Sequence, residues 1–344
     1  MKDFARILLA WYAVHKRVLP WRDTKDPYKI WISEIILQQT RVAQGYDYFL
    51  RFIRRFPNVL SLARASQDEV LKYWEGLGYY SRARNLHEAA RSINGVFPST
   101  YEGVRALKGV GDYTAAAVCS FAYHMPYAVV DGNVQRVLAR IFGIDIPTDS
   151  AEGKKRITSL AQELLDKSRP DDYNQAIMDF GALQCVPASP NCAVCPYVRV
   201  CAAYKTGRVE QLPVRAAKTA LAKRFFSYIY VEQDGHTWLH RREGQDIWRG
   251  LYEPLLLETP SALTERELQA SSFWKSLFGR RKPRLLAGPV KHVLSHRIIY
   301  AWFYGVSVPP SLPLPEGFVR VREKDLKKYA FPRLVQKVLI RKKP

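Results

Sequence analysis

Four cysteines gathered in one short segment constrain this chain more than any other feature of its sequence. Cys185, Cys192, Cys195 and Cys201 follow the spacing C-x6-C-x2-C-x5-C, and Cys119 stands apart from them. Structural zinc sites commonly pair two short C-x2-C steps, whereas only one short step occurs here. The spacing therefore favours a [4Fe–4S] cluster over zinc, and disulfides are the third alternative. We expect Cys119 to pack as a small apolar side chain.

The charge of the chain favours a polyanionic partner. The 344 residues contain 53 Lys and Arg against 32 Asp and Glu, a formal net charge of +21. DNA, RNA and anionic membranes would each attract such a protein. The apolar run Ile7 to Val14 is too short to span a bilayer, and no cleavage site of small residues follows it. We expect an amphipathic first helix, no membrane partner and a reducing intracellular setting.

The periodicity of the sequence changes along the chain and predicts two domains. Residues 1–204 carry apolar side chains at helical spacing, as in Val134, Val137, Leu138 and Ile141. The basic stretch 205–223 is predicted to be a linker. Residues 224–344 predict a smaller α/β domain, with a β-hairpin around Asp234-Gly235 and helices near 263–278 and 330–341.

Three segments of the first domain carry residues suited to chemistry. Gly109-Val110-Gly111 forms a Gly-x-Gly turn within about 99–122, between two predicted helices, the first opened by a capping box of Ser99 and Glu102. The helix after that turn begins with free N–H groups that favour a phosphate. Asp131 ends an apolar run at a predicted helix N-cap, which would keep its carboxylate ionised. Glu34 lies among apolar neighbours, where desolvation should raise its pKa and suit it to act as a general acid.

Together with the cysteine spacing, these segments resemble the MutY family of adenine DNA glycosylases, in the endonuclease III (helix-hairpin-helix) superfamily. The resemblance is strong over about residues 17–201. The segments that carry it are Leu19-Pro20-Trp21-Arg22, Asp26-Pro27-Tyr28, Trp31 to Thr40, Gly76 to Leu86, Leu107 to Ala117, Val129 to Val137 and Tyr173-Asn174-Gln175.

The resemblance implies an enzyme that removes adenine from DNA. Glu34 would protonate the adenine, Asp131 would stabilise the oxocarbenium-like sugar or trap it covalently, and Tyr113 would support this centre. Lyase members of the superfamily carry a nucleophilic lysine at the position of Tyr113, so the chain is expected to be a monofunctional glycosylase. Lys108 precedes the glycines and does not occupy that position.

The resemblance also implies the groups that contact the substrate. Gln39 and Tyr79 would wedge into the duplex as the adenine is flipped out. The remaining DNA- or base-contacting candidates of the first domain are Trp21, Arg22, Gly109, Gly111, Asn133 and Gln175. The implied cofactor is a [4Fe–4S] cluster held by the four clustered cysteines. The implied partner is double-stranded DNA with adenine opposite 8-oxoguanine or guanine, bound by a monomer in the bacterial cytoplasm, at the nucleoid.

The second domain resembles the MutT-like (Nudix) domain that ends MutY proteins. Ile247 to Tyr252 matches an early strand–loop motif, and Ser295 with His296 would read the lesion. Leu251 to Ala270 lacks the carboxylate array of a Nudix box, so this domain should bind and not hydrolyse.

Two positions depart from the family pattern. The first cluster loop, residues 186–191, has no Lys or Arg, and Leu294 stands where the family has phenylalanine.

Two alternative functions differ from this one in the residues that they need. A related glycosylase for another mismatched base would lack Glu34 and the Gln38-Gln39 context. A non-enzymatic iron–sulfur DNA-binding protein would need neither Glu34 nor Asp131. Both carboxylates are present, so the sequence favours the adenine glycosylase.

Overall fold

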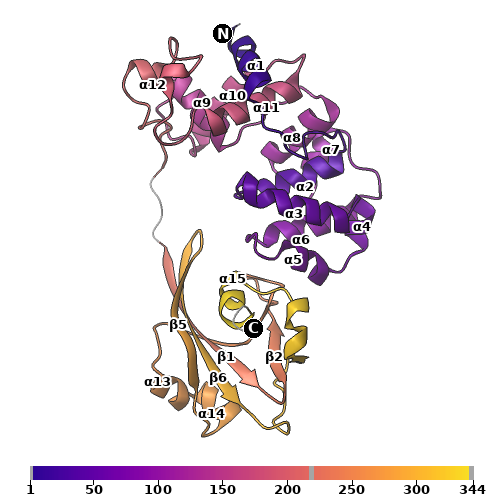
Figure 1. Ribbon diagram of the computed structural model, residues 1–344, viewed down its shortest axis with the longest axis vertical. Coiled ribbons are helices and arrows are strands. Elements are labelled where there is room, and N and C mark those ends of the chain that lie inside the picture. Colours follow the sequence, from indigo (N-terminus) through magenta and orange to yellow (C-terminus); the bar gives the residue numbers. More distant parts are fainter. Residues whose placement is uncertain (1–2, 217–220, 341–344) are drawn as a thin grey trace. The chain divides into compact units, whose positions relative to one another are not determined.

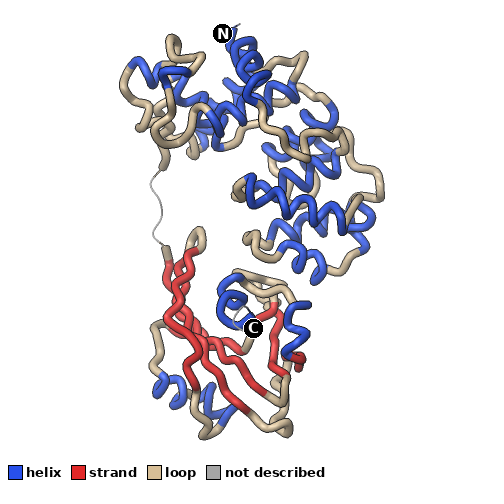
Figure 2. The backbone as a smooth tube through the Cα atoms, in the orientation of Figure 1, coloured by secondary structure: helices blue, strands red, loops and turns tan. Residues whose placement is uncertain are grey.

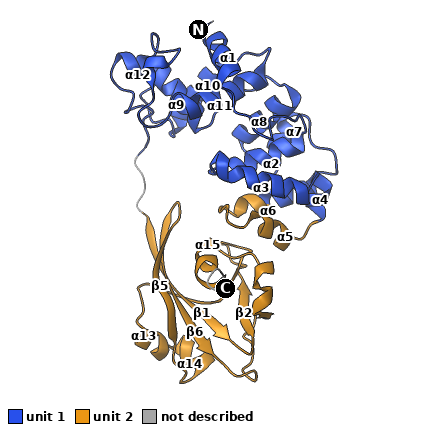
Figure 3. Cartoon of the chain, viewed as in Figure 1, with its two compact units in different colours: residues 1–64, 85–217 blue, residues 65–84, 218–344 orange. Residues whose placement is uncertain are grey.

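The computed structural model describes residues 3–216 and 221–340 and divides into two compact units. The first unit contains Met1–Arg64 and Asn85–Ala217, and the second contains Ala65–Arg84 and Lys218–Pro344 (Figure 3). Parts of the predicted domains and linker, residues 1–2, 217–220 and 341–344, lie outside the described residues. Over the described ranges, no helix is both long enough and apolar enough to cross a membrane.

The first unit is helical, as predicted (Figure 2). Its α-helices are α1 (Asp3–His15), α2 (Pro27–Leu37), α3 (Val42–Arg55), α4 (Val59–Arg64), α7 (Tyr101–Arg105), α8 (Asp112–Tyr123), α9 (Gly132–Phe142), α10 (Ala151–Leu164), α11 (Pro170–Leu183) and α12 (Ala202–Lys205), with a short 3-10 turn η1 (Cys192–Val194). Helix α6 (Ser81–Ser92) spans the boundary between the units, and α5 (Gln67–Trp74) belongs to the second unit.

One apolar core joins α1, α9, α10 and α11. Leu8, Leu138, Ile157 and Phe180 are among its fully buried members. Leu212, from the stretch predicted as a linker, is also buried in this core. The α9–α11 crossing is close, because a Cβ on Gly181 would lie 2.6 Å from Cβ of Asn133. This crossing fixes the start of α9, where Asp131 lies.

The Gly-x-Gly turn joins α7 to α8, as the sequence predicts. Gly109 has a φ of 78°, and a Cβ there would lie 2.7 Å from Cβ of Asn85, so the turn needs glycine for both reasons. The predicted capping box at Ser99 is wrong by one residue. Thr100 is the N-cap of α7, since its side chain accepts the N–H of Gly103.

The second unit contains two β-sheets and the helical segment 65–84 (Figures 1 and 3). The four-stranded sheet has the order β4-β1-β6-β5, in which β1 and β6 are parallel, and the three-stranded sheet has the order β3-β2-β7. The strands are β1 (Ala222–Glu232), β2 (His236–Arg241), β3 (Tyr252–Glu253), β4 (Leu255–Thr259), β5 (Arg284–Val293), β6 (Arg297–Ser307) and β7 (Phe318–Arg322). The helices are α13 (Glu265–Ala270), α14 (Ser272–Phe278), η2 (Glu323–Lys328), α15 (Arg333–Val335) and η3 (Gln336–Ile340).

The two sheets and α15 enclose one core, in which Phe226, Leu239, Val321 and Leu334 pack together. The other face of the large sheet packs against α14 through Trp274 and Phe278.

Two expectations for this unit differ from the structure. The predicted hairpin around Asp234-Gly235 is confirmed only at its turn, where Gln233 and His236 form one antiparallel bridge; β1 and β2 on either side of it belong to different sheets. The helix near 263–278 is two helices, since Ser271 is an extended residue that ends α13 and caps α14. The described part of the helix near 330–341 is helical from Arg333 to Ile340.

Candidate active site, cysteine cavity and second-unit pocket

A cavity of about 580 Å³ in the first unit brings the three predicted catalytic residues together. Glu34 comes from the middle of α2, Tyr113 from the first turn of α8, and Asp131 from the N-cap of α9. Trp21, Arg22, Asn133 and Gln175, which the sequence predicted to contact substrate, line the same cavity. Side chains far apart in the sequence therefore meet at one site.

Glu34 is buried and forms a short hydrogen bond. Its side chain lies on an apolar helix, and the residue is 4% exposed. The Tyr113 hydroxyl donates to Glu34 Oε2 over 2.7 Å. Glu34 also lines the cavity. Burial raises the pKa of Glu34 to about 7, and the Tyr113 hydrogen bond opposes this rise. The expected upward shift is thus confirmed, and the carboxyl is protonated over much of the range below pH 7.

Asp131 caps α9, as predicted. Its Oδ1 accepts the N–H of Val134 over 2.8 Å, and its Oδ2 accepts Nδ2 of Asn133 over 2.7 Å. Burial raises the pKa of Asp131 above its ordinary value, although these hydrogen bonds oppose the rise. The N-cap position was expected to favour the ionised carboxylate; its hydrogen bonds do lower the pKa of Asp131, but burial raises it by more.

Tyr113 is held as a neutral donor. Burial and the nearby Glu34 and Asp131 carboxylates raise its pKa well above the ordinary value. The phenol therefore stays protonated and donates a hydrogen bond to Glu34.

An ion-pair cluster that the sequence did not reveal supports one wall of this cavity. Asp179 on α11 accepts Nη1 and Nη2 of Arg22 over 2.7 and 2.8 Å, and it accepts Nε of Arg17 over 2.8 Å. Trp21, the residue before Arg22, is buried against Phe49. The sequence did contain a signal for this residue, because Asp179 is a carboxylate within the apolar stretch Ala176 to Leu183. The same kind of pattern identified Glu34. Arg22 is thus a paired group whose edge lines the cavity.

The other first-unit candidates are placed as follows. Gln175 accepts a hydrogen bond from the Tyr12 hydroxyl over 2.9 Å, so Tyr12 is a second residue that the sequence analysis missed. Gln39 is exposed in the turn after α2, with a φ of 56°. Gly111 is the N-cap of α8, and a Cβ there would meet open space. Gln39 and Gly111 do not line the cavity around Glu34.

The four clustered cysteines line one apolar cavity of the first unit. None of them forms a disulfide. Arg140, which is 2% exposed, donates from Nη1 to Cys185 Sγ over 3.5 Å and to the Val186 carbonyl, and from Nη2 to the Pro187 carbonyl. Among the described residues, no three His, Cys, Asp or Glu side chains converge around the position of a single ion. Cys119 is buried in α8, away from this cavity.

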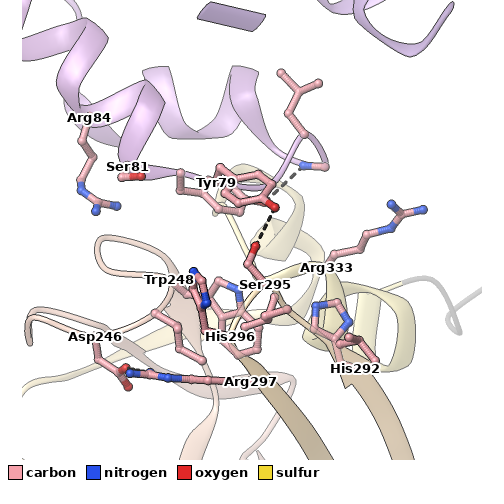
Figure 4. Close-up of a pocket in the computed structure, with 17 residues that line it drawn as sticks. Tyr79, Ser81, Arg84, Asp246, Trp248, His292, Ser295, His296, Arg297 and Arg333 are labelled. Atoms are coloured by element: carbon pink, nitrogen blue, oxygen red, sulfur yellow. Dashed lines mark hydrogen bonds and ion pairs between the residues drawn. The ribbon is translucent and has the colours of Figure 1, made fainter. Parts of the chain in front are cut away.

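A second cavity, of about 430 Å³, lies within the second unit (Figure 4). The loop before α6 contributes Tyr79, the turn between β5 and β6 contributes Ser295 and His296, and the loop after β2 contributes Trp248. The Tyr79 hydroxyl and the Ser295 hydroxyl are 2.7 Å apart and share a hydrogen bond. Two predicted DNA contacts, 216 positions apart in the chain, therefore meet directly.

Three of the four carboxylates between Leu251 and Ala270 are bound to protein groups. Glu253 accepts from Arg242 and Tyr228, Glu258 accepts from Arg224, and Glu267 completes the capping box of α13. Spread in this way over separate elements, they do not form the clustered array that a Nudix box would use to hold Mg²⁺.

Comparison with known proteins agrees with both units. The family described as HhH-GPD superfamily base excision DNA repair protein matches residues 32–167, and the NUDIX domain family matches residues 227–341. The predicted fold class is thereby confirmed. Glu34, Tyr113 and Asp131 all lie within the first matched segment.

Individual relatives extend the match over most of the chain. The adenine DNA glycosylase of Buchnera aphidicola subsp. Acyrthosiphon pisum is 35% identical over 254 residues, which is 72% of this chain and 73% of the relative. That of Buchnera aphidicola subsp. Baizongia pistaciae is 33% identical over 307 residues, 86% of this chain and 84% of the relative. The structure of a thermostable thymine-DNA glycosylase matches with a TM-score of 0.56 and 31% identity, over 60% of this chain and 96% of that chain.

The Tyr113 hydrogen bond gives a testable prediction for Glu34. Tyr113→Phe should raise the pKa of Glu34 above about 7, because it removes a hydrogen bond that favours the ionised carboxylate. NMR titration of a carboxyl-labelled protein measures this shift. Tyr123→Phe is the matched control, since Tyr123 lies on the same helix but donates to the carbonyl of Pro98. An unchanged or lowered pKa in Tyr113→Phe would contradict the assignment.

Proposed function

The chain belongs to the family of adenine DNA glycosylases, and we propose that it hydrolyses the N-glycosidic bond of adenine in mispaired DNA. The observation that carries this proposal is the meeting of Glu34, Tyr113 and Asp131 in one cavity, with burial raising the pKa of Glu34 to about 7. Hydrolysis of a glycosidic bond uses one carboxylic acid that donates a proton and one carboxylate that stabilises the sugar cation. The net charge of +21 suits a DNA substrate.

In the proposed reaction, the Glu34 carboxyl gives its proton to a ring nitrogen of the adenine. The bond between that base and C1′ of the sugar breaks, its electrons leave with the base, and the sugar becomes an oxocarbenium-like cation. The Asp131 carboxylate stabilises this cation or bonds to C1′. The hydrogen bonds from Val134 and Asn133 support the ionised form of Asp131 against the cost of burial. Water then adds at C1′ and leaves an abasic site.

Tyr113 makes the enzyme monofunctional in this proposal. A lyase needs an amine nucleophile at the reacting sugar, and the cavity presents a phenol hydrogen-bonded to Glu34 in that place. The lining of the cavity contains arginines but no lysine. Cleavage of the DNA strand is therefore not part of the proposed reaction.

The second unit would recognise the base opposite the adenine, which we propose to be 8-oxoguanine in preference to guanine. Its pocket presents the Tyr79, Ser295 and His296 side chains, which can exchange hydrogen bonds with an oxidised purine edge and its phosphate. Ser295 and His296 lie in the segment that matches the NUDIX domain family, and the ion pairs and cap formed by Glu253, Glu258 and Glu267 support binding without hydrolysis.

The four clustered cysteines fit a [4Fe–4S] cluster, and we propose that Cys185, Cys192, Cys195 and Cys201 ligate it. They line one cavity, none is in a disulfide, and the buried guanidinium of Arg140 next to Cys185 would stabilise anionic thiolates. Iron–sulfur ligation by four thiolates would tie residues 185–201 to the core around α9. The cluster takes no part in the proposed glycosidic step.

Glu34→Gln should remove most of the activity while DNA binding is retained. The amide fills the same volume but cannot donate the carboxyl proton, so the single-turnover rate of adenine release should fall about a thousandfold. The assay is a duplex with adenine opposite 8-oxoguanine, in which strand breaks should follow only after hot alkali. Glu88→Gln, an exposed glutamate of the first unit, is the control. Normal turnover by Glu34→Gln, strand cleavage without alkali, or release of thymine in place of adenine would contradict the proposal.

The cluster proposal predicts about four irons and four inorganic sulfides per chain. Cys192→Ser should lower both in elemental and sulfide analysis, because it removes one thiolate ligand. Cys119→Ala should leave both unchanged, since Cys119 lies outside the cysteine cavity. One zinc and no sulfide per chain would contradict the cluster.

Removal of the two hydrogen-bonding side chains of the β5–β6 turn should weaken recognition of 8-oxoguanine. Ser295→Ala with His296→Ala should reduce the preference for adenine opposite 8-oxoguanine over adenine opposite guanine by about 1–3 kcal/mol, the usual cost of one mismatched position. Single-turnover rates on the two duplexes measure the ratio. Ser307→Ala with His236→Ala removes the same two groups outside the pocket and is the control. Leu294→Phe should keep or increase the preference, and an unchanged ratio in the first double mutant would contradict the assignment.

A further inference from the structure

Three guanidinium groups converge on the single carboxylate of Asp246 in the second unit. Arg224 donates from Nη1 to Oδ1 over 2.9 Å and from Nη2 to Oδ2 over 2.8 Å. Arg242 donates to Oδ2 over 2.9 Å, and Arg297 donates to Oδ1 over 2.6 Å. Charge-assisted hydrogen bonds of this kind are stronger than neutral ones and fix geometry. Asp246 is therefore the common anchor of three separate segments.

These segments include the turn proposed to read the lesion. Arg224 lies on β1, and Arg242 directly follows β2. Arg297 is the first residue of β6 and closes the two-residue turn Ser295-His296, because its carbonyl accepts the N–H of Leu294 over 2.8 Å. A group that holds the Arg297 side chain therefore also restrains the turn beside it.

Asp246 is more important to Arg297 than to the other two arginines. Arg224 also binds Glu258 through two hydrogen bonds of 2.6 Å, and Arg242 also binds Glu253 over 2.7 Å. Over residues 3–216 and 221–340, the ion-pair partner of Arg297 is Asp246. Loss of the Asp246 charge would leave the first two guanidinium groups paired and the third without a carboxylate.

Asp246 also lines the second-unit cavity itself. It lies two residues before Trp248, and both line the second-unit cavity together with Ser295 and His296 (Figure 4). Trp248 has a φ of 61° and Tyr79 a φ of 45°, so two non-glycine aromatic residues hold left-handed backbones around one cavity. Strained conformations of this kind persist only where the surroundings enforce them, and they concentrate at functional sites. The Asp246–Arg297 pair connects the Trp248 loop to the turn.

The carboxylate is charged under all working conditions. Burial by itself would raise the pKa of Asp246, but the hydrogen bonds from Arg224, the Ile247 N–H and Arg297 hold it well below its usual range. A neutral substitute therefore differs from the native residue in charge at every pH of an assay.

We propose that Asp246 is a positioning residue for base discrimination, which acts through Arg297 to hold the Ser295-His296 turn in place beside Trp248. This inference rests on the proposed role of the second-unit pocket in recognising 8-oxoguanine. It assigns no contact between Asp246 and the lesion.

Asp246→Asn tests the inference because it keeps the shape of the side chain and removes its charge. The ratio of single-turnover rates on adenine opposite 8-oxoguanine and adenine opposite guanine should fall roughly three- to tenfold, the effect of weakening one hydrogen-bonded contact. The rate on adenine opposite guanine should stay within about twofold, because the catalytic groups lie in the first unit. Asp325→Asn is the matched control, since Asp325 also binds two basic side chains, of Arg322 and Lys328, but does not line the cavity.

Arg297→Gln is the second variant, and it leaves the ion pairs of Arg224 and Arg242 with Asp246 in place. If Asp246 acts through Arg297, the double mutant Asp246→Asn/Arg297→Gln should lower the ratio no further than either single mutant. Additive effects, or equal losses on both duplexes, would overturn the positioning role. Arg297→Gln decides the question even if Asp246→Asn fails to fold, since an unchanged ratio in that variant also overturns it.

The same measurements separate this inference from the proposed function. If the wild-type chain shows no preference for 8-oxoguanine, the proposed role of the pocket fails and the inference fails with it. If Ser295→Ala with His296→Ala lowers the ratio while Asp246→Asn and Arg297→Gln do not, the pocket recognises the lesion and the inference alone is wrong.

Discussion

The burial of one carboxyl group, that of Glu34, organises the first unit. A buried ionised carboxylate without partners is very costly, so the group either takes up a proton or receives hydrogen bonds. Here both occur, because its pKa rises to about 7 and the Tyr113 hydroxyl lies 2.7 Å from Oε2. Helices α2 and α8 must pack closely for this hydrogen bond to form. The packing of the helices and the chemistry of the acid therefore depend on the same contact.

The beginnings of two helices supply the other polar groups of this cavity. Tyr113 lies in the first turn of α8, and Asp131 caps α9. A side chain at a helix start can accept a hydrogen bond from one of the unpaired N–H groups there, as Asp131 does from Val134, while it faces a cavity. The turn between α7 and α8 needs glycine at position 109, where a Cβ would meet Asn85. Local backbone rules thus set the direction from which each catalytic candidate enters the cavity.

The sequence predicted those features that depend on local pattern. The apolar surroundings of Glu34, the N-cap at Asp131, the Gly-x-Gly turn and the cysteine spacing are each visible within about twenty residues. Pairings between distant segments were not visible. The Arg22–Asp179 ion pair joins positions 157 apart, and the separation of β1 and β2 into two sheets depends on strands that come much later in the chain. Local alternation predicts a strand, but it does not predict which strand will be its neighbour. The Thr100 cap was missed for a smaller reason, because two adjacent hydroxyl residues could each have started α7.

The cavity around Glu34 and the cavity of the second unit are built by different physical means. In the first unit, desolvation and a few hydrogen bonds adjust the protonation of Glu34, whose own side chain is buried. In the second unit, the cavity is bordered by the Ser295-His296 turn and by Tyr79 and Trp248, which have left-handed backbones. The Asp246–Arg297 ion pair connects the Trp248 loop to this turn. Ionic networks at a partly exposed site fix position at small cost in stability, since water still solvates them in part. The proposed proton donor and the proposed lesion-reading turn therefore rest on separate sets of interactions, so a substitution in one set can leave the other intact.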